Sequence, residues 1–257
     1  MGLTYAEGMS SSPYLRNHKL RIYDTDPKKI TALRENTKFK VYENLGEAIE
    51  TSDIIFIVVK PFHSEALFKE MRSHINSSQV FVSLMAGVTI ARIQELLDIK
   101  KVIRAMPNLP AQVGKGVTSY TQSDDVSRIE LLTVRNFLDT TGESIHVHTE
   151  REIDASTGIS GSGPAYVFYF MQSMLEAALK MGFSEHDSKV LVSNTFEGAI
   201  ELFNQSNSSP TQWMDRVASK GGTTRAALDS MEDNNVKELI KEAAFAAFDR
   251  AVELGKQ

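Results

Sequence analysis

Two glycine-rich stretches in the second half of the chain combine hydroxyl side chains with the expected start of a helix. The first reads Ser160-Gly-Ser-Gly-Pro164 and the second reads Ser219-Lys-Gly-Gly-Thr-Thr224. Glycine leaves backbone N–H groups accessible, and a helix N-terminus favours negative charge, so both stretches suit a bound carboxylate or phosphate. Each also fits a flexible turn between helices, and Thr223 or Thr224 also fits a simple N-cap.

Three further loops follow short apolar runs in the first half of the chain. They are Val59-Lys60-Pro61, Met85-Ala86-Gly87 and Met106-Pro107-Asn108. A Lys-Pro pair taken alone is typical of an ordinary turn. Three such loops at the carboxyl ends of successive strands predict one shared crevice, because ligands bind there in a doubly wound sheet.

Asp24 follows the first β-type run of the chain. In a dinucleotide fold an acidic residue at this point holds the adenosine ribose, about twenty residues beyond the glycine fingerprint. Counting back from Asp24 leads to Gly2, which fits the third glycine of a G-x-G-x-x-G turn. Asp24 also fits the start of a turn before Pro27.

The remaining candidates for chemistry are few. His146 and His148 lie on one face of an expected strand, but no third ligand has metal-type spacing, so we expect no metal site. A Ser-His-Asp triad has no better support. The chain contains no cysteine, which excludes disulfides and thiolate chemistry.

The first half of the chain alternates β-type runs with helical patterns. Ile54–Val59 is continuously apolar, as expected of a strand buried on both faces of a parallel sheet. Asp26 is an expected helix cap, with Pro27 at the first helical position. This alternation predicts an α/β, doubly wound parallel sheet. We expect strands at residues 19–23, 54–59, 79–84, 101–105 and 144–148, with helices at 89–97 and 126–139.

After residue 150 the pattern becomes entirely helical. Ser184 is an expected cap, and Ser209-Pro-Thr-Gln212 is an expected capping box. The sequence therefore predicts two domains, residues 1–150 and residues 151–257. We expect helices at residues 164–181 and 184–203, a third that opens at 209, and two more after residues 224 and 235.

Composition narrows the classes of protein further. The 257 residues carry a formal net charge of −5, which argues against a nucleic-acid partner. No apolar run approaches the length of a membrane span, and the N-terminus lacks a secretion-signal pattern. We therefore expect a cytoplasmic protein with no membrane partner.

Taken together, these motifs resemble the pyrroline-5-carboxylate reductase family, and the resemblance covers essentially the whole chain. The family's fold is a dinucleotide-binding (Rossmann-like) domain followed by a helical dimerisation domain. The stretches that carry the resemblance are Val59–Pro61, Met85–Ile90, Arg104–Asn108, Thr157–Tyr166 and Ser219–Thr224. The last two, Thr157–Tyr166 and Ser219–Thr224, are specific for the family when they occur together in this order.

The resemblance implies hydride transfer from a reduced nicotinamide to the C=N bond of 1-pyrroline-5-carboxylate, which gives L-proline. It implies a homodimer, with a larger ring of dimers as a further assembly. Thr224 is the expected catalytic hydroxyl. The implied cofactor-binding residues are Gly2, Asp24, Val59, Lys60, Pro61, Met85, Ala86, Gly87 and Asn108. The implied substrate-binding residues are Thr157, Ser219, Gly221, Gly222, Thr223 and Thr224.

Two choices stay open at this level. Asp24 favours NADH because a carboxylate repels a 2′-phosphate, whereas the resemblance favours NADPH, whose phosphate Lys28 or Lys29 could reach. The alternatives to the reductase are a related imine or hydroxyacid dehydrogenase on the same plan and a non-catalytic regulatory homologue.

The resemblance also bears on the start of the sequence. Members of the family usually begin with a strand and then G-x-G-N-M-G, followed by a further glycine. Met1-Gly2 fits the end of that turn and Gly8 fits the later glycine. We therefore expect the first strand and two glycines to be absent, through a late start or missing residues. The central gap would measure roughly 10 Å, which is two strand spacings.

Overall fold

The computed structural model describes residues 1–15, 18–35 and 38–255. Contacts within the chain define two compact units. The first comprises Met1–Ser162 with Ala246–Gln257, and the second comprises Gly163–Phe245. The boundary predicted near residue 150 separates the part with strands from the all-helical part. The two compact units are defined by contacts instead, so they do not test that boundary, and it stays a prediction.

A five-stranded sheet forms the centre of the first unit. Its order is β3-β4-β5-β6-β7, in which β3, β4 and β5 are parallel, while β6 is antiparallel to β5 and parallel to β7. The sequence predicted every strand of this sheet except β6, in which four of the seven residues are serine, threonine or glutamine. The strands are β3 (Ile54–Ile57), β4 (Val80–Ser83), β5 (Val102–Met106), β6 (Gly116–Gln122) and β7 (Gly142–His146).

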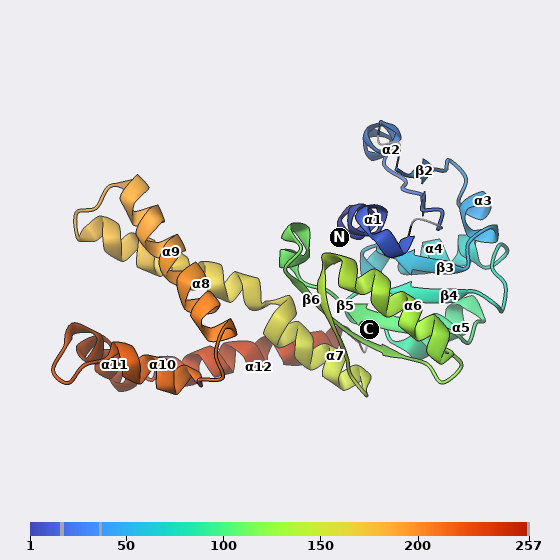
Figure 1. The fold of residues 1–257 in the computed structure, drawn as a ribbon. Helices are drawn as coiled ribbons and strands as arrows, with labels where there is room; N and C mark the ends of the chain where they lie inside the picture. The colour runs from blue at the N-terminus through green and yellow to red at the C-terminus, as the bar shows by residue number, and fades with distance from the viewer. Residues whose placement is uncertain (16–17, 36–37, 256–257) are drawn as a thin grey trace. The chain divides into compact units, whose positions relative to one another are not determined.

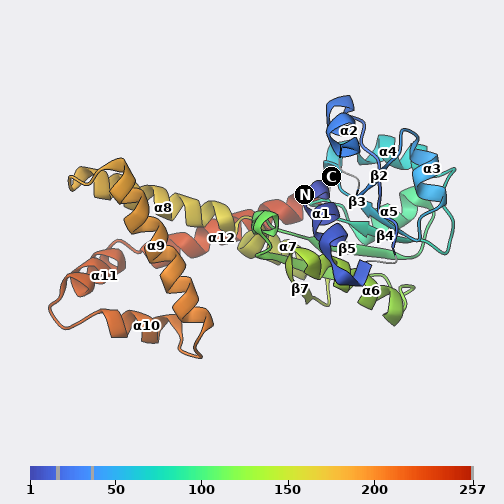
Figure 2. The ribbon, with the colours of Figure 1, turned by 45° about the horizontal axis from the view of Figure 1, so that its top comes forward.

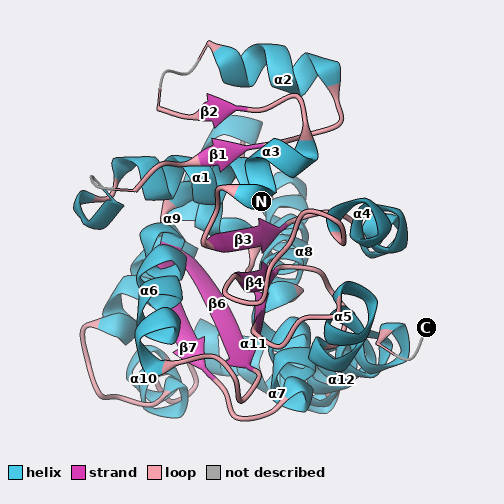
Figure 3. Ribbon diagram, turned by 90° about the vertical axis from the view of Figure 1, so that its right-hand side faces the viewer, coloured by secondary structure: helices cyan, strands magenta, loops and turns pink. Residues whose placement is uncertain are grey.

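Two shorter strands form a sheet of their own. β1 (Arg21–Ile22) pairs in parallel with β2 (Lys40–Val41), and in the described part of the chain neither pairs with β3. Figure 3 shows β1 and β2 apart from β3. The sheet is therefore open between β1 and β3, at the position where the sequence predicted a gap.

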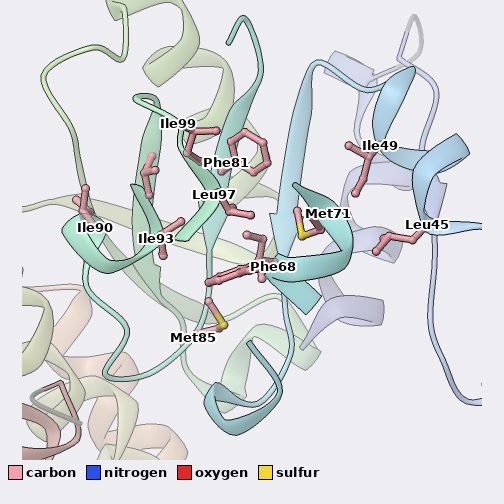
Figure 4. Close-up of a cluster of buried hydrophobic side chains, with 12 residues drawn as sticks. Leu45, Ile49, Phe68, Met71, Phe81, Met85, Ile90, Ile93, Leu97 and Ile99 are labelled. Carbon is pink, nitrogen blue, oxygen red and sulfur yellow. The ribbon is translucent and has the colours of Figure 1, made fainter. Parts of the chain in front are cut away.

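Helices cover both faces of the larger sheet (Figure 3). Alternate residues of β4 point to opposite faces, so Val80 and Val82 join one buried cluster while Phe81 joins the other. The first cluster lies under α1 (Gly2–Ser11) and α6 (Arg128–Leu138), and the second lies under α4 (Ser64–Met71) and α5 (Ile90–Leu97) (Figure 4). Two further helices are α2 (Pro27–Arg34) and α3 (Leu45–Glu50).

Helix α1 was not assigned as an element from the sequence. Its position depends on Gly8, where an added Cβ would lie 3.0 Å from the backbone oxygen of Thr140 and 3.0 Å from Cγ2 of Thr141. The buried Tyr5 hydroxyl also lies 2.6 Å from Oγ1 of Thr118. Close packing on the sheet thus specifies a helix that local sequence signals leave undefined.

The rest of the chain is helical, as predicted. Helix α7 (Glu150–Ser156) lies in the first unit, and α8 packs along α9 in the second. The shorter α10 and α11 follow before α12 begins (Figures 1 and 2). The bounds are α8 (Gly163–Lys180), α9 (Glu185–Asn204), α10 (Pro210–Val217), α11 (Thr223–Asp233) and α12 (Val236–Leu254).

Most of the predicted helix starts are confirmed. Asp26 and Ser184 cap α2 and α9, and Ser209 with Gln212 forms the capping box of α10. The alternative that Thr223 or Thr224 caps a helix is wrong. Gly222 is the N-cap of α11 and the threonines are its first two residues.

Among the helices of the described residues, none combines the length and the apolar character that crossing a membrane requires.

Candidate functional site

The three predicted strand-end loops leave the same edge of the sheet. Ile57 of β3 pairs with Ser83 of β4, and Ser83 pairs with Arg104 of β5, so these parallel strands run in step. The loops at 59–61, 85–87 and 107–108 therefore begin side by side. This edge is where a doubly wound sheet binds its ligands.

The N-terminus of α1 reaches the same edge. A Cβ added to Gly2 would lie 3.7 Å from Cβ of Val58, directly after β3. Met1 is the N-cap and forms no side-chain capping bond. The first N–H groups of a helix have no partner within the helix, so this end of α1 suits a phosphate group.

The loop that follows β4 is held from two sides. The Met85 side chain is buried in the cluster drawn in Figure 4, so it supports the loop from the core. Gly87 has φ +75°, and a Cβ there would lie 3.0 Å from the backbone carbon and Cβ of Leu254. Position 87 therefore requires glycine. At this edge the loop offers its backbone together with Ala86.

The loop after β3 contributes two exposed residues. Val59 is half-buried against the same core cluster, whereas Lys60 and Pro61 are exposed. The Lys60 carbonyl accepts a hydrogen bond from the His63 N–H at 2.9 Å. Lys60 thus carries the charge of this loop.

Asn108 and Asp24 both have structural partners. The Asn108 Oδ1 accepts a hydrogen bond from the Val117 N–H at 2.9 Å, which ties the loop after β5 to the start of β6. The Asp24 Oδ1 accepts one from the Asp26 N–H at 2.9 Å, as the turn alternative expects, and its Oδ2 lies 3.5 Å from Nζ of Lys29.

The residues from Ser219 to Thr224 lie in the second unit. The Gly222 N–H donates to the Ser219 carbonyl at 3.0 Å, and Gly221 has φ +70°. This turn delivers the chain into α11 through an N-cap without a side chain. The N–H groups of the first turn of α11, beside the hydroxyls of Thr223 and Thr224, suit a carboxylate.

Thr157 lies in the first unit, where α7 ends in a π-helical turn, Thr157–Gly161. Its Oγ1 donates to the Ile153 carbonyl at 3.0 Å. Ser160 and Gly161 of the first glycine cluster therefore belong to this π-helical turn, Ser162 follows as a bend, and Gly163 begins α8.

Sequence reasoning assigned no role to Arg104, the most buried charged side chain among the described residues. Arg104 is 2% exposed, and its guanidinium binds Glu150 at 3.0 Å and Asp154 at 2.6 Å. The signal was an arginine inside the apolar strand Val102–Met106, but the carboxylates lie 46 and 50 residues further along the chain.

The histidine pair has no ligand geometry. His146 Nε2 lies 2.7 Å from the Gln122 Oε1, and its ring centre lies 5.2 Å from that of Tyr120 with the two rings tilted by 50°. Within residues 1–15, 18–35 and 38–255 no three His, Asp or Glu side chains gather as a metal-binding group.

A mostly parallel sheet whose strand-end loops meet an uncapped helix N-terminus defines the class of dinucleotide-binding α/β proteins. Family models agree with this class and with the order of the two parts. Residues 1–87 match a model described as NADP oxidoreductase, coenzyme F420-dependent, and residues 150–254 match one described as pyrroline-5-carboxylate reductase dimerisation.

Individual relatives narrow the class. Pyrroline-5-carboxylate reductase from Escherichia coli is 31% identical over all of this chain and 95% of its own. The Corynebacterium melassecola reductase is 35% identical over 82% of this chain and 79% of its own. The chain belongs to the pyrroline-5-carboxylate reductase family.

Solved structures share the fold over nearly the full length. The enzyme from Coxiella burnetii has a TM-score of 0.91 at 27% identity and covers 100% of this chain and 95% of its own. The Plasmodium falciparum enzyme, solved with NADP bound, has a TM-score of 0.88 at 28% identity and covers 99% and 94%.

Proposed function

We propose that this protein reduces the C=N bond of 1-pyrroline-5-carboxylate with a nicotinamide coenzyme and forms L-proline, the last step of proline biosynthesis. The observation that carries the proposal is the full-length similarity to curated reductases, within which the strand-end loops and the turn at Ser219–Thr224 are both present. The protein is thus an oxidoreductase acting on a C=N bond.

The first unit supplies the residues for the coenzyme, which we propose is NADPH, with NADH as the second choice. The N-terminus of α1 at Gly2 fits a pyrophosphate, and Asp24 with Lys29 would face the adenosine ribose. The loops Val59–Pro61 and Met85–Gly87, with Asn108, would border the nicotinamide end. When bound, the reduced coenzyme supplies the hydride.

The second unit supplies most residues for the substrate. The N–H groups and hydroxyls at Ser219, Gly221, Gly222 and Thr223 would bind the carboxylate. Thr224 would place its hydroxyl at the imine nitrogen. Thr157, in the first unit, is proposed separately as a further substrate-binding residue. The imine nitrogen of the substrate can be protonated without a strong acid from the protein. The main task of the protein is therefore to orient the acceptor carbon. Orientation alone can lower such a barrier by several kcal/mol, roughly 7–11 at its upper range.

The assembly follows from the same family assignment. Residues 150–254 match the dimerisation model, which supports a homodimer. We further propose that the dimers assemble into a larger ring. We also propose a domain boundary near residue 150, with mainly coenzyme-binding residues before it and mainly substrate-binding residues after it. We also propose that the protein acts in the cytoplasm.

Turnover of a threonine variant tests the reaction and the site together. The wild-type protein should oxidise NADPH with pyrroline-5-carboxylate and release proline. Thr224→Ala should lower kcat/KM about 10- to 100-fold by removing one positioned hydroxyl. Thr224→Ser keeps a hydroxyl and should recover most of this loss.

Thr211→Ala is the matched control, because Thr211 is the second residue of α10 as Thr224 is of α11. Its kcat/KM should stay within about twofold of the wild-type value, as for most surface substitutions. Equal kinetics of the Thr224→Ala and Thr211→Ala proteins would remove Thr224 from the site. Absence of proline formation by the wild-type protein would reject the reaction itself.

A further inference from the structure

Arg104 is the charged residue of strand β5, and it is almost completely buried. Its Nη1 donates to the Glu150 Oε1 at 3.0 Å and its Nη2 donates to the Asp154 Oδ1 at 2.6 Å. The side chains of the two acids are 30% and 14% exposed. A buried guanidinium is costly unless it is paired, and here each arm of the fork binds its own carboxylate.

Both carboxylates lie on one face of helix α7, four residues apart, with Ile153 buried between them. Arg104 therefore fixes this helix on the sheet through two points and not one. Thr157 follows Asp154 by three residues, and its hydroxyl donates to the Ile153 carbonyl at 3.0 Å. The guanidinium thus determines where the end of α7, and with it Thr157, lies on β5.

The same network reaches the loop after β4. The Glu150 Oε1 also accepts a hydrogen bond from the Ile90 N–H at 2.9 Å. Ile90 is the first residue of α5, and Gly87 precedes it by three residues. Glu150 also lies in the first turn of α7, so its negative charge is placed at the N-termini of two helices, where it is favourable.

A second residue of β5 contacts the segment that follows α7. Met106 lies on the face of Arg104, two residues further along the strand. A Cβ added to Gly161 would lie 3.3 Å from the Met106 Cε, so the π-helical turn passes closely over the end of β5. The loop proposed for the nicotinamide and the residue Thr157 are therefore anchored to one strand.

We propose that Arg104 is a positioning residue, which keeps the 85–87 loop and Thr157 in register with each other by binding Glu150 and Asp154. The inference rests on the proposed function, because it gives these two segments their roles. It requires the planar fork of arginine, since the single ammonium group of lysine cannot bind both carboxylates in the same way.

Kinetics of three variants test the proposal. Arg104→Lys keeps the charge and loses the fork, and Asp154→Asn weakens one arm. Lys101→Met is the control, because Lys101 lies beside β5 and its 2.7 Å ion pair with Glu130 of α6 is also largely buried, but it does not involve α7. Removing this pair tests the effect of a lost ion pair alone.

The Arg104→Lys protein should lose about 10- to 100-fold in kcat, because small displacements of positioning groups are expensive in rate. Its Kd for NADPH, measured by fluorescence, should change by less than about threefold, since most of the coenzyme site lies elsewhere. The Asp154→Asn protein should lose less. The double variant should resemble Arg104→Lys, because both changes break one network. The kcat of Lys101→Met should stay within about twofold of wild type.

Hydrogen exchange gives a readout that does not depend on activity. Amides of residues 88–91 and 154–161 should exchange faster in Arg104→Lys than in Lys101→Met, while β4 stays equally protected in both. Equal kcat values for the two proteins, or a uniform loss of protection across the sheet, would overturn the proposal.

The proposal remains testable if Arg104→Lys does not fold or if the wild-type protein is inactive. If Arg104→Lys does not fold, Asp154→Asn is judged by the same kinetic and exchange criteria. If the wild-type protein forms no proline, the proposed reaction fails, and the exchange pattern alone decides whether Arg104 positions the two segments.

Discussion

Asp24 follows strand β1 and has two contacts that bear on the choice between NADPH and NADH. One carboxylate oxygen accepts the Asp26 N–H, and the other lies near the Lys29 ammonium group. Lys29 is thus partly neutralised by the very carboxylate that would repel a 2′-phosphate. One residue both limits the attraction for the phosphate and shapes the turn before α2.

Asp24→Asn should shift this balance toward NADPH. Asparagine keeps an oxygen for the Asp26 N–H, but it removes the negative charge and releases Lys29. The ratio of kcat/KM for NADPH to that for NADH should rise about threefold to tenfold, as expected for one exposed charge of this kind.

Steady-state kinetics with both coenzymes measure that ratio. Lys28→Gln tests the other lysine that could reach the 2′-phosphate, because in the described contacts Lys28 donates only its backbone N–H to Asp26. The ratio should fall if its ammonium group binds that phosphate. A ratio unchanged by Asp24→Asn would mean that position 24 does not face the ribose.

Helix α7 connects the sheet to the π-helical turn, and its N-terminus is stabilised by a capping box. The Thr149 side chain accepts the Glu152 N–H, and the Glu152 carboxylate accepts the N–H groups of Thr149 and His148, both at 2.8 Å. Hydrogen bonds from Thr149 and His148 hold the pKa of Glu152 below its ordinary value of 4.5. The ionised form of Glu152 therefore stabilises the start of this helix.

Stability should accordingly depend on pH in the acid range. A carboxyl whose folded pKa is lowered contributes stability above its unfolded pKa, and the contribution is lost as pH falls through the folded pKa. The wild-type protein should lose stability as pH falls below about 4.5, which is near the unfolded value.

Glu152→Gln should show a shallower loss, because glutamine keeps an acceptor for the capping box and does not titrate. Urea unfolding at a series of pH values measures the difference, with Glu143→Gln on β7 as the control. Parallel pH profiles for wild type and Glu152→Gln would contradict the assignment.

At the scale of the whole molecule, the two compact units differ in how much apolar surface they leave exposed. Helix α8 presents Val167, Phe168 and Tyr169 with 46%, 60% and 78% of their surface exposed. Three successive helical residues point in different directions, so together they leave much of the surface of α8 apolar, which is typical of a segment that packs against a partner. A second copy of the chain is the natural partner, because residues 150–254 match the dimerisation model.

Phe168→Asp should therefore weaken the dimer. A charge placed in an apolar interface should raise the fraction of monomer at micromolar concentration. Burying even a neutral polar group without a hydrogen bond costs roughly 2–7 kcal/mol, and an unpaired carboxylate costs more. Sedimentation velocity measures the masses. Ile129→Asp, at a 79% exposed position of α6 in the first unit, should leave the mass unchanged. Equal masses for all three proteins would exclude Phe168 from the interface.

Features that depend on neighbours in the chain could be predicted from the sequence. The apolar run at Ile54 indicated a buried strand, and Asp26, Ser184 and Ser209 indicated helix starts, because capping involves residues two or three positions apart. The motifs also indicated the family. Within the candidate site, the strand-end loops were predicted for the same reason, since each follows directly from a recognisable strand.

Features that depend on distant residues were decided only by the tertiary structure. The pairing of Arg104 with two acids of α7 and the close approach of Gly87 to Leu254 both join segments far apart in the sequence. Strand β6 was missed for a different reason, because its many polar residues hide the strand pattern. The spacing of residues along the chain predicts which face of a helix or strand a side chain occupies. It does not predict which other segment will cover that face. The sequence by itself therefore determined the class of protein and its local elements, while packing decided which of their side chains meet.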